Sequence, residues 1–258
     1  MNIVVLVKQT FDTEAKIVLD GSGNIDPTGV NLVLDPYSEF AVEEGIRIKE
    51  RLGGEVTILC VGPDSAQTAI RQAFAMGADK GYLIKDDQLA GGDSSVTAKI
   101  LAAALGKIPH DIILAGFKSV DSGTAQLVPR VAELLKVPHV HVVTKIDIDG
   151  SKAVATKEID DGFEIIEVAL PAVFSAQQGL AEPRYPSMKG IMQAKKKPLE
   201  TWTLDNVGVD AAAVSTGKTK VIQYTMPAER KGGRIIEGEV PDAIKELVQL
   251  TRNEAKVI

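Results

Sequence analysis

Apolar runs alternate with amphipathic segments over the first 145 residues of the chain. The runs at residues 3–7, 56–61, 81–84 and 111–115 are typical of strands that are buried on both faces. Between them, apolar residues at helical spacing predict helices over residues 36–52, 64–76, 93–105 and 124–135. Strands that alternate with helices form parallel sheets covered on both sides and joined by right-handed crossovers. The pattern therefore predicts an α/β, doubly wound core over residues 1–145.

Helix ends are signalled at several places. Asp35 precedes Pro36 and provides an N-cap acceptor, and Gly53-Gly54 ends the same helix. Gly77 closes the second helix. Within Gly91-Gly92-Asp93-Ser94-Ser95, a helix N-cap is favoured over a phosphate loop, because such loops follow the first strand of a sheet and this one precedes a middle helix.

The pattern changes after residue 145. Residues 142–147, 152–159, 163–169 and 172–175 are strand-like and are separated by Asp-Gly turns, which predicts antiparallel additions to the sheet. A polar loop over residues 176–198 contains a predicted helix that starts near Ser187. A strand-like segment at residues 219–225 and a final helix over residues 241–255 complete the chain. We therefore expect an α/β domain over residues 1–200 and a C-terminal arm over residues 201–258 that lies on a neighbouring subunit.

Composition excludes several classes of protein. Of 258 residues, 45 % are hydrophobic and 25 % charged, which excludes disorder as the main state. No apolar run approaches the roughly 20 residues of a membrane span, and the first residues do not resemble a secretory leader, so we expect a cytoplasmic protein. The formal net charge of −6 argues against nucleic acid as the main partner. Cys60 is the only cysteine, so an intrachain disulfide is excluded.

Several motifs that suggest chemistry have a simpler explanation. Residues 217–219 read Gly-Lys-Thr, but the glycine that a P-loop needs five positions earlier is Ala212. His139 and His141 alternate on one strand face, yet no acidic cluster is adjacent, so we expect no metal site. Neither a nucleophile elbow nor a paired-carboxylate motif is present, so we expect no catalytic residue.

The loop after the strand at residues 111–115 is the best candidate for ligand binding. It lies at the carboxyl end of a parallel strand and runs into a helix, where free N–H groups attract phosphate. Gly116 allows close approach of the backbone, and Ser122 and Thr124 carry hydroxyls that can donate to a phosphate. A plain capped loop is the alternative.

Residues 179–198 form the second candidate. Pro183 and Pro186 stiffen this loop, Leu180 leads it, and a basic stretch containing Lys195 and Lys196 follows. An apolar tip beside positive charge suits a docking surface, with a solvated loop as the alternative.

At this segment the sequence resembles the β subunits of electron transfer flavoproteins. Residues 180–185 read Leu-Ala-Glu-Pro-Arg-Tyr and residues 192–197 read Met-Gln-Ala-Lys-Lys-Lys, as is characteristic of that family. Residues 157–164 and 170–173 are similar to the signature of that family, and this sequence departs from the signature at Phe174. Further matches at residues 7–8, 35–37, 41–44, 75–79 and 121–126 extend the resemblance over nearly the whole chain.

The resemblance implies an electron carrier rather than an enzyme. It implies a mainly parallel sheet of the Rossmann-like, adenine-nucleotide-binding type and a heterodimer with an α subunit that carries most of an FAD site. The donor would be an acyl-CoA dehydrogenase-type protein of fatty acid or acyl-CoA metabolism, and the acceptor would be linked to quinone or ferredoxin. The implied partner-binding residues are Leu180, Glu182, Pro183, Arg184, Tyr185, Lys195 and Lys196.

The resemblance also implies a nucleotide in the β subunit, either AMP or, in the electron-bifurcating type, a second FAD. The implied contacts are Leu6, Lys8, Asp35, Pro36, Tyr37, Ser38, Val61, Gly116, Lys118, Asp121, Ser122, Gly123, Thr124, Ala125, Gln126 and Leu127. Thr124-Ala125-Gln126 resembles the bifurcating members, and the small side chains there leave room for more than one phosphate. This favours FAD over AMP. A stand-alone adenine-nucleotide sensor of the same fold is the alternative function, but it leaves residues 182–185 unexplained.

Overall fold

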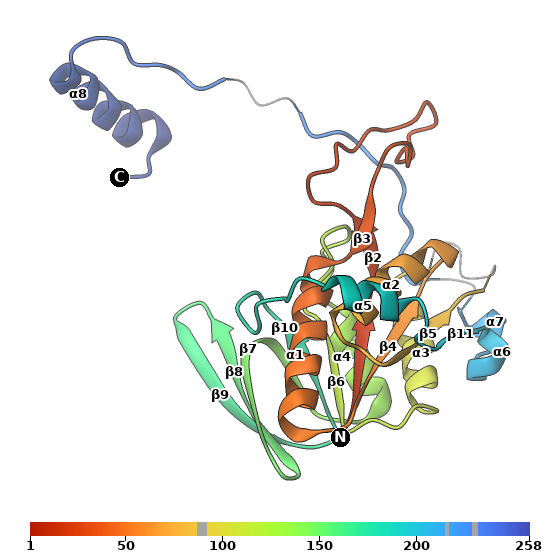
Figure 1. The fold of residues 1–258 in the computed structure, drawn as a ribbon. Coiled ribbons are helices and arrows are strands. Elements are labelled where there is room, and N and C mark those ends of the chain that lie inside the picture. The colour runs from red at the N-terminus through yellow and green to blue at the C-terminus, as the bar shows by residue number, and fades with distance from the viewer. Residues whose placement is uncertain (87–91, 215–216, 229–231) are drawn as a thin grey trace. The chain divides into compact units, whose positions relative to one another are not determined.

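The computed structural model describes residues 1–86, 92–214, 217–228 and 232–258. Its centre is a nine-stranded sheet (Figure 1) with the order β11-β5-β4-β1-β6-β10-β7-β8-β9. The strands are β1 (Asn2–Val7), β4 (Glu55–Val61), β5 (Lys80–Ile84), β6 (Ile112–Gly116), β7 (His139–Asp149), β8 (Lys152–Ile159), β9 (Gly162–Ala169), β10 (Ala172–Ala176) and β11 (Leu199–Trp202).

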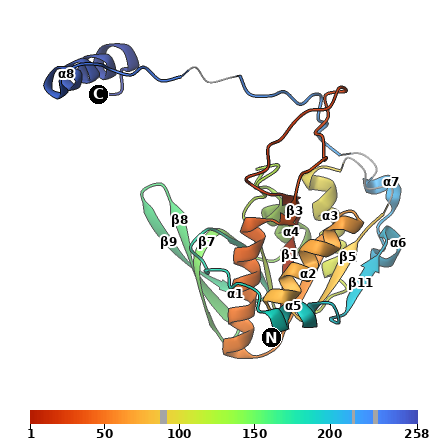
Figure 2. The ribbon, with the colours of Figure 1, turned by 45° about the horizontal axis from the view of Figure 1, so that its top comes forward.

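Helices cover both faces of this sheet, as Figures 1 and 2 show. On one face lie α1 (Pro36–Leu52) and α2 (Gln67–Met76), with a 3-10 turn at Asp64–Ala66 before α2. On the other lie α3 (Ser94–Leu105) and α4 (Leu127–Leu135). Alternate residues of β1 supply the two cores, since Ile3 and Val5 pack toward α1 while Val4 and Leu6 pack toward α3 and α4. The predicted doubly wound α/β fold is confirmed.

Two predicted N-caps and one predicted helix start are also confirmed. Oδ1 of Asp35 accepts from the backbone at the start of α1, and Oδ1 of Asp93 does so for α3. Gly91, the first residue of that second motif, lies outside the described residues. Oγ of Ser187 caps α5 (Met188–Ala194).

Three predicted elements differ from the structure, and some of the observed strands were not predicted. The segment predicted as a last antiparallel strand, β10, runs parallel to both neighbours and lies between β6 and β7. The helix expected from residue 124 begins at Leu127, because Ala125 has a φ of 52°, which is outside the helical region. Residues 219–225 form no strand, and β11, which was not predicted, pairs with β5 instead. A hairpin of β2 (Gln9–Phe11) and β3 (Leu32–Leu34) was also not predicted. The antiparallel pairing of β7, β8 and β9 matches the prediction.

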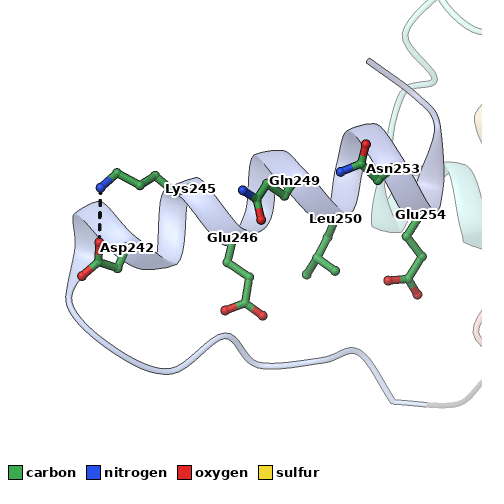
Figure 3. A pocket seen from close by; sticks show the side chains of 7 residues that line it. All are labelled: Asp242, Lys245, Glu246, Gln249, Leu250, Asn253 and Glu254. Atoms are coloured by element: carbon green, nitrogen blue, oxygen red, sulfur yellow. Dashed lines mark hydrogen bonds and ion pairs between the residues drawn. The ribbon is translucent and has the colours of Figure 1, made fainter.

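The chain separates into two compact units, which we describe independently. The first contains residues 1–18 and 25–222, including the short helices α6 (Leu204–Val207) and α7 (Ala211–Val214). The second contains residues 19–24 and 223–258, with α8 (Val240–Leu250) and a π-helical turn at Thr251–Ala255. Polar and charged side chains such as Asp242, Glu246 and Gln249 line a shallow hollow along α8 (Figure 3). No helix among the described residues has the length and hydropathy that crossing a membrane requires.

Candidate functional site

The order of the parallel strands reverses beside β1. From β1 the chain proceeds to β4 and β5 on one side, and after α3 it returns to β6 on the other side. Open α/β sheets bind ligands at such a switch point, outside the carboxyl ends of the strands. Here those ends carry Lys8, which follows β1, and residues 117–126, which follow β6 and which we call the β6 loop.

Lys8 reaches across the switch point to the β6 loop. Its Nζ lies 2.7 Å from Oδ1 and 2.6 Å from Oδ2 of Asp121, and 3.4 Å from Oγ of Ser119. Partial burial of Asp121 alone would raise the pKa of its carboxyl, but hydrogen bonds from Lys8 and Ser119 outweigh this and lower that pKa. The contact between Lys8 and Asp121 joins the ends of the two central strands.

Asp35 joins the β6 loop to α1. Its side chain is fully buried; Oδ1 accepts from the N–H groups of Tyr37 (3.0 Å) and Ser38 (3.3 Å), and Oδ2 accepts from the N–H of Val120 at 2.8 Å. Burial raises the pKa of this carboxyl despite these three bonds. The carboxylate therefore points into the protein and holds the β6 loop against the start of α1.

The end of the β6 loop presents free donors. Gly123 and Ala125 have positive φ angles of 60° and 52°, which turns successive peptide groups toward one side. The N–H groups of residues 124–127 donate to no acceptor in the described part of the chain, and they lie at the N-terminus of α4, which begins at Leu127. Oγ1 of Thr124 lies 3.2 Å from Oγ of Ser94 at the start of α3. Free N–H groups and hydroxyls at a helix N-terminus suit a phosphate group.

Tyr37, Phe117 and Lys118 form an aromatic group at the start of this loop, and of these three residues Phe117 was not among the predicted contacts. The rings of Tyr37 and Phe117 meet edge to face with centroids 4.7 Å apart. Nζ of Lys118 lies 5.5 Å from the Tyr37 centroid and 5.1 Å from that of Phe117. These distances permit cation–π attraction, which orients the Lys118 side chain over the rings.

The structure places the other predicted contacts as follows. The side chain of Leu6 is buried in the second core, and Leu6 pairs in register with Leu59 of β4 and Ala115 of β6. Ser38 is also buried, and its Oγ accepts from the N–H of Lys8 at 3.4 Å. Pro36 opens α1, and Val61 ends β4 in a half-buried position. The β6 loop, Lys8 and the start of α1 are thus brought together by direct contacts.

A second unpredicted cluster lies on β7 and β10. Oγ of Ser175, which is fully buried, accepts from the N–H of Val142 at 2.8 Å and lies 2.7 Å from Nδ1 of His141. Burial lowers the pKa of His141, and the charges of His139 and Lys157 lower it further. Val142 has a φ of 61°, unusual for a β-branched residue. No group of three or more potential metal ligands occurs among the described residues.

The segment 179–198, which we call the docking loop, differs from expectation at its leading residue. Leu180 is only 8 % exposed and belongs to the first core, so its side chain is unavailable as a surface anchor. Tyr185 and Met188 are instead 98 % and 77 % exposed. Lys195 and Lys196 are exposed, whereas Arg184 is bound by carboxylates of α1.

Comparisons with known proteins agree with this architecture. Residues 22–207 match the family model described as the electron transfer flavoprotein domain. The chain is 42 % identical over 259 aligned positions to electron transfer flavoprotein subunit beta of Bacillus subtilis, with 100 % of both chains covered. It is 45 % identical to the protein of the same name from Syntrophomonas wolfei, covering 100 % of this chain and 98 % of that one. The Clostridium acetobutylicum protein of that name is 34 % identical, with 98 % and 99 % covered.

Proposed function

The chain belongs to the electron transfer flavoprotein family, as a β subunit, and from this premise we propose that it pairs with an α subunit and passes electrons through FAD. The donor is an acyl-CoA dehydrogenase-type protein, and the acceptor is linked to quinone or ferredoxin. The observation that carries the proposal is the match over the full chain to proteins that are named as β subunits. A bound flavin supplies the redox chemistry, while this chain's residues bind and position it.

The β subunit holds its own nucleotide at the switch point, and this nucleotide is a second FAD rather than AMP. The free N–H groups of residues 124–127 and the Thr124 hydroxyl support binding of a phosphate there. Lys8 and Asp35 hold the β6 loop in place from β1 and α1. Ser122, Gly123 and Ala125 have small side chains, which leave room for the rest of a dinucleotide.

Acid extraction of the native heterodimer tests the nucleotide. We expect two flavins and negligible AMP per heterodimer, whereas one flavin and one AMP would replace the FAD assignment with AMP. Thr124→Ala should reduce the content of the β-subunit nucleotide, because it removes a hydroxyl at the phosphate site. Thr68→Ala on α2 is the matched control and should retain the parent content, since the Thr68 hydroxyl donates to the carbonyl of Ser65, away from the β6 loop. Full nucleotide content in the Thr124 variant would contradict the assigned phosphate position.

We further propose that the docking loop contacts the donor dehydrogenase. Tyr185, Met188 and Met192 are 98 %, 77 % and 69 % exposed, so apolar surface is grouped around α5, beside Lys195 and Lys196. Truncating an apolar anchor at a small interface typically costs about 2 kcal/mol or more. Met188→Ala should therefore slow electron exchange at limiting dehydrogenase concentration more than tenfold. Leu52→Ala, which truncates an exposed leucine of α1, should leave the rate unchanged.

The remaining part of the proposal concerns the C-terminal arm, which we assign to contact with the α subunit. Within it, Ile244, Leu247 and Val248 form one apolar side of α8 and stay exposed at 54 %, 54 % and 41 %. An amphipathic helix with an uncovered apolar side is suited to bind a partner. Deleting residues 241–258 should weaken the heterodimer while the β subunit stays folded. Co-purification of the α subunit at full stoichiometry would contradict this role.

A further inference from the structure

One side of α1 carries a row of charged residues that faces the docking loop. Glu43, Arg47 and Glu50 are spaced four and three residues apart, so they lie along one face of the helix. Arg47 donates from Nε to Oε1 of Glu43 at 2.8 Å and from Nη2 to the carbonyl of Glu182 at 2.9 Å. Arg47 therefore links Glu43 of the same helix to the backbone of the docking loop.

The guanidinium of Arg184 binds both carboxylates of this row. Its Nε and Nη2 donate to Glu43 at 2.8 and 3.0 Å, and its Nη1 and Nη2 donate to Glu50 at 2.6 and 2.9 Å. The backbone N–H of Arg184 adds a bond to Glu43 at 3.2 Å. Two forked pairs on one planar group leave it little rotational freedom. The loop is thus fixed immediately before Tyr185.

Glu43 is unusual because its side chain is only 2 % exposed. Burial alone would raise the pKa of its carboxyl, but the hydrogen bonds from Arg184 and Arg47 outweigh burial and lower that pKa. A buried ion pair is weak support for stability, since an apolar pair of similar volume often stabilises as well. What the charged pair provides beyond stability is a single geometry for the loop.

The other end of the loop is held in a similar way. Nη1 of Arg71 donates to the carbonyls of Ala194 and Lys197 at 2.6 and 2.8 Å. Nζ of Lys197 donates to the carbonyls of Phe74 and Ala78 at 2.9 and 2.6 Å. These bonds link the ends of α5 and α2, so residues 185–193, most of which are exposed, lie between two fixed ends.

We propose that Arg184 is a positioning residue, which together with Glu43 and Glu50 holds residues 185–193 in the conformation that the donor dehydrogenase recognises. Arg184 acts through the loop rather than as a contact of its own. The inference rests on the docking role proposed above and assigns the residues that prepare the loop for it. Fixing a loop in its bound conformation improves affinity because less conformational entropy is lost on binding. The rate of electron transfer within the formed complex should not depend on it.

The test uses the native heterodimer and two variants. Arg184→Lys keeps the charge but loses the forks, and it should raise the KM for the heterodimer in the dehydrogenase assay by about fivefold to tenfold, with kcat unchanged. The double variant Glu43→Leu/Arg184→Met removes the buried carboxylate together with its half-buried guanidinium partner and should stay folded. It should show the same rise in KM, together with faster hydrogen exchange over residues 185–193 when no dehydrogenase is present. The control is Glu167→Gln, which breaks the exposed ion pair with Lys152 and should change neither the KM nor the hydrogen exchange over residues 185–193.

The outcomes separate this inference from the docking proposal. Parent-like hydrogen exchange over residues 185–193 in a folded double variant would show that Arg184 does not fix the loop, and the inference would be wrong. Faster exchange with an unchanged KM would also overturn it, because the positioning would then serve no docking. If Met188→Ala leaves electron exchange unchanged as well, the docking proposal itself fails.

Discussion

Replacing Gly116 with alanine should push apart the two segments that form the candidate nucleotide site. Gly116 ends β6, and a Cβ atom there would lie 2.7 Å from Cβ of Tyr37, 2.8 Å from its carbonyl carbon and 3.0 Å from the backbone nitrogen of Ser38. Carbon atoms pack best at about 3.5–4.0 Å, so β6 or the first turn of α1 has to move by about 1 Å. The obstructing atoms include backbone, which no change of rotamer removes.

The magnitude follows from this overlap. Overpacking of this kind costs about 1–3 kcal/mol, and for a chain of this size each kcal/mol lowers Tm by about 2–4 °C. We expect a loss of about 2–12 °C in the heterodimer, measured by thermal unfolding. Because Asp35 ties the start of α1 to Val120, the displacement also disturbs the β6 loop. The content of the β-subunit nucleotide after acid extraction should therefore fall with Tm.

The control is Gly21→Ala, since a Cβ at Gly21 meets nothing within 4 Å and should leave both quantities at the parent values. A Gly116→Ala heterodimer with the Tm and nucleotide content of the parent would refute this reasoning, because α1 and β6 would then accommodate the added Cβ atom without loss of stability. A lower Tm with full nucleotide content would show that the contact supports the fold but does not shape the nucleotide site.

Further substitutions probe three other features. Burial raises the pKa of Glu44 to about 7 against the charges of Arg51 and Arg47, so the folded state holds its proton more tightly and stability falls as pH rises from 4.5 to 7. Glu44→Gln should remove this dependence, which amounts to about 3 kcal/mol of unfolding free energy at most. Urea unfolding at pH 5 and at pH 8 measures the difference. The positive φ of Val142 costs about 1–2 kcal/mol in backbone strain, which glycine does not pay, so Val142→Gly should keep or raise Tm. Val154→Gly, in the regular strand β8, should lower Tm. Gly190→Ala puts a Cβ 2.5 Å from the carbonyl oxygen of Ala75 and should both lower Tm and slow electron exchange with the dehydrogenase, if α5 must stay seated on α2.

The parallel core was predictable because its signals are local. Strands such as β1 are continuous apolar runs, since both of their faces are covered. The N-caps at Asp35, Asp93 and Ser187 involve backbone groups two or three residues away, and such short-range bonds restrict which residue types occur there. Elements of this kind need no knowledge of the rest of the fold.

The position of β10 was not predictable in this way. It follows three strands that form an antiparallel hairpin series, so its order along the chain suggested one more antiparallel partner. Instead it enters the sheet between β6 and β7, where Phe174 and Val173 are fully buried on opposite faces. A short apolar run is compatible with either pairing, and only contacts across the whole sheet decide between them.

The docking loop shows a similar limit for single residues. Leu180 and Met188 both stand in a polar, proline-containing segment, and neither neighbourhood distinguishes a core side chain from an exposed one. Leu180 follows the end of β10 at Ala176 by four residues and belongs to the first core, while Met188 begins a short helix and is exposed. Burial here depends on the path of the backbone, which residue type alone does not specify.

Two carboxylates show why the candidate site was only partly visible in the sequence. Oδ1 of Asp35 caps α1 while its Oδ2 binds Val120, 85 residues away, and Oδ1 of Asp93 caps α3 while its Oδ2 binds Lys218, 125 residues away. The near partner is recognisable as a cap, but the distant one has no local signature. A carboxylate offers two acceptor oxygens, whereas a serine or threonine cap offers one hydroxyl. The second partner therefore explains why aspartate stands at these helix starts. An aspartate cap beside the carboxyl end of a parallel strand indicates that some loop is held there, while the identity of that loop emerges only from the fold.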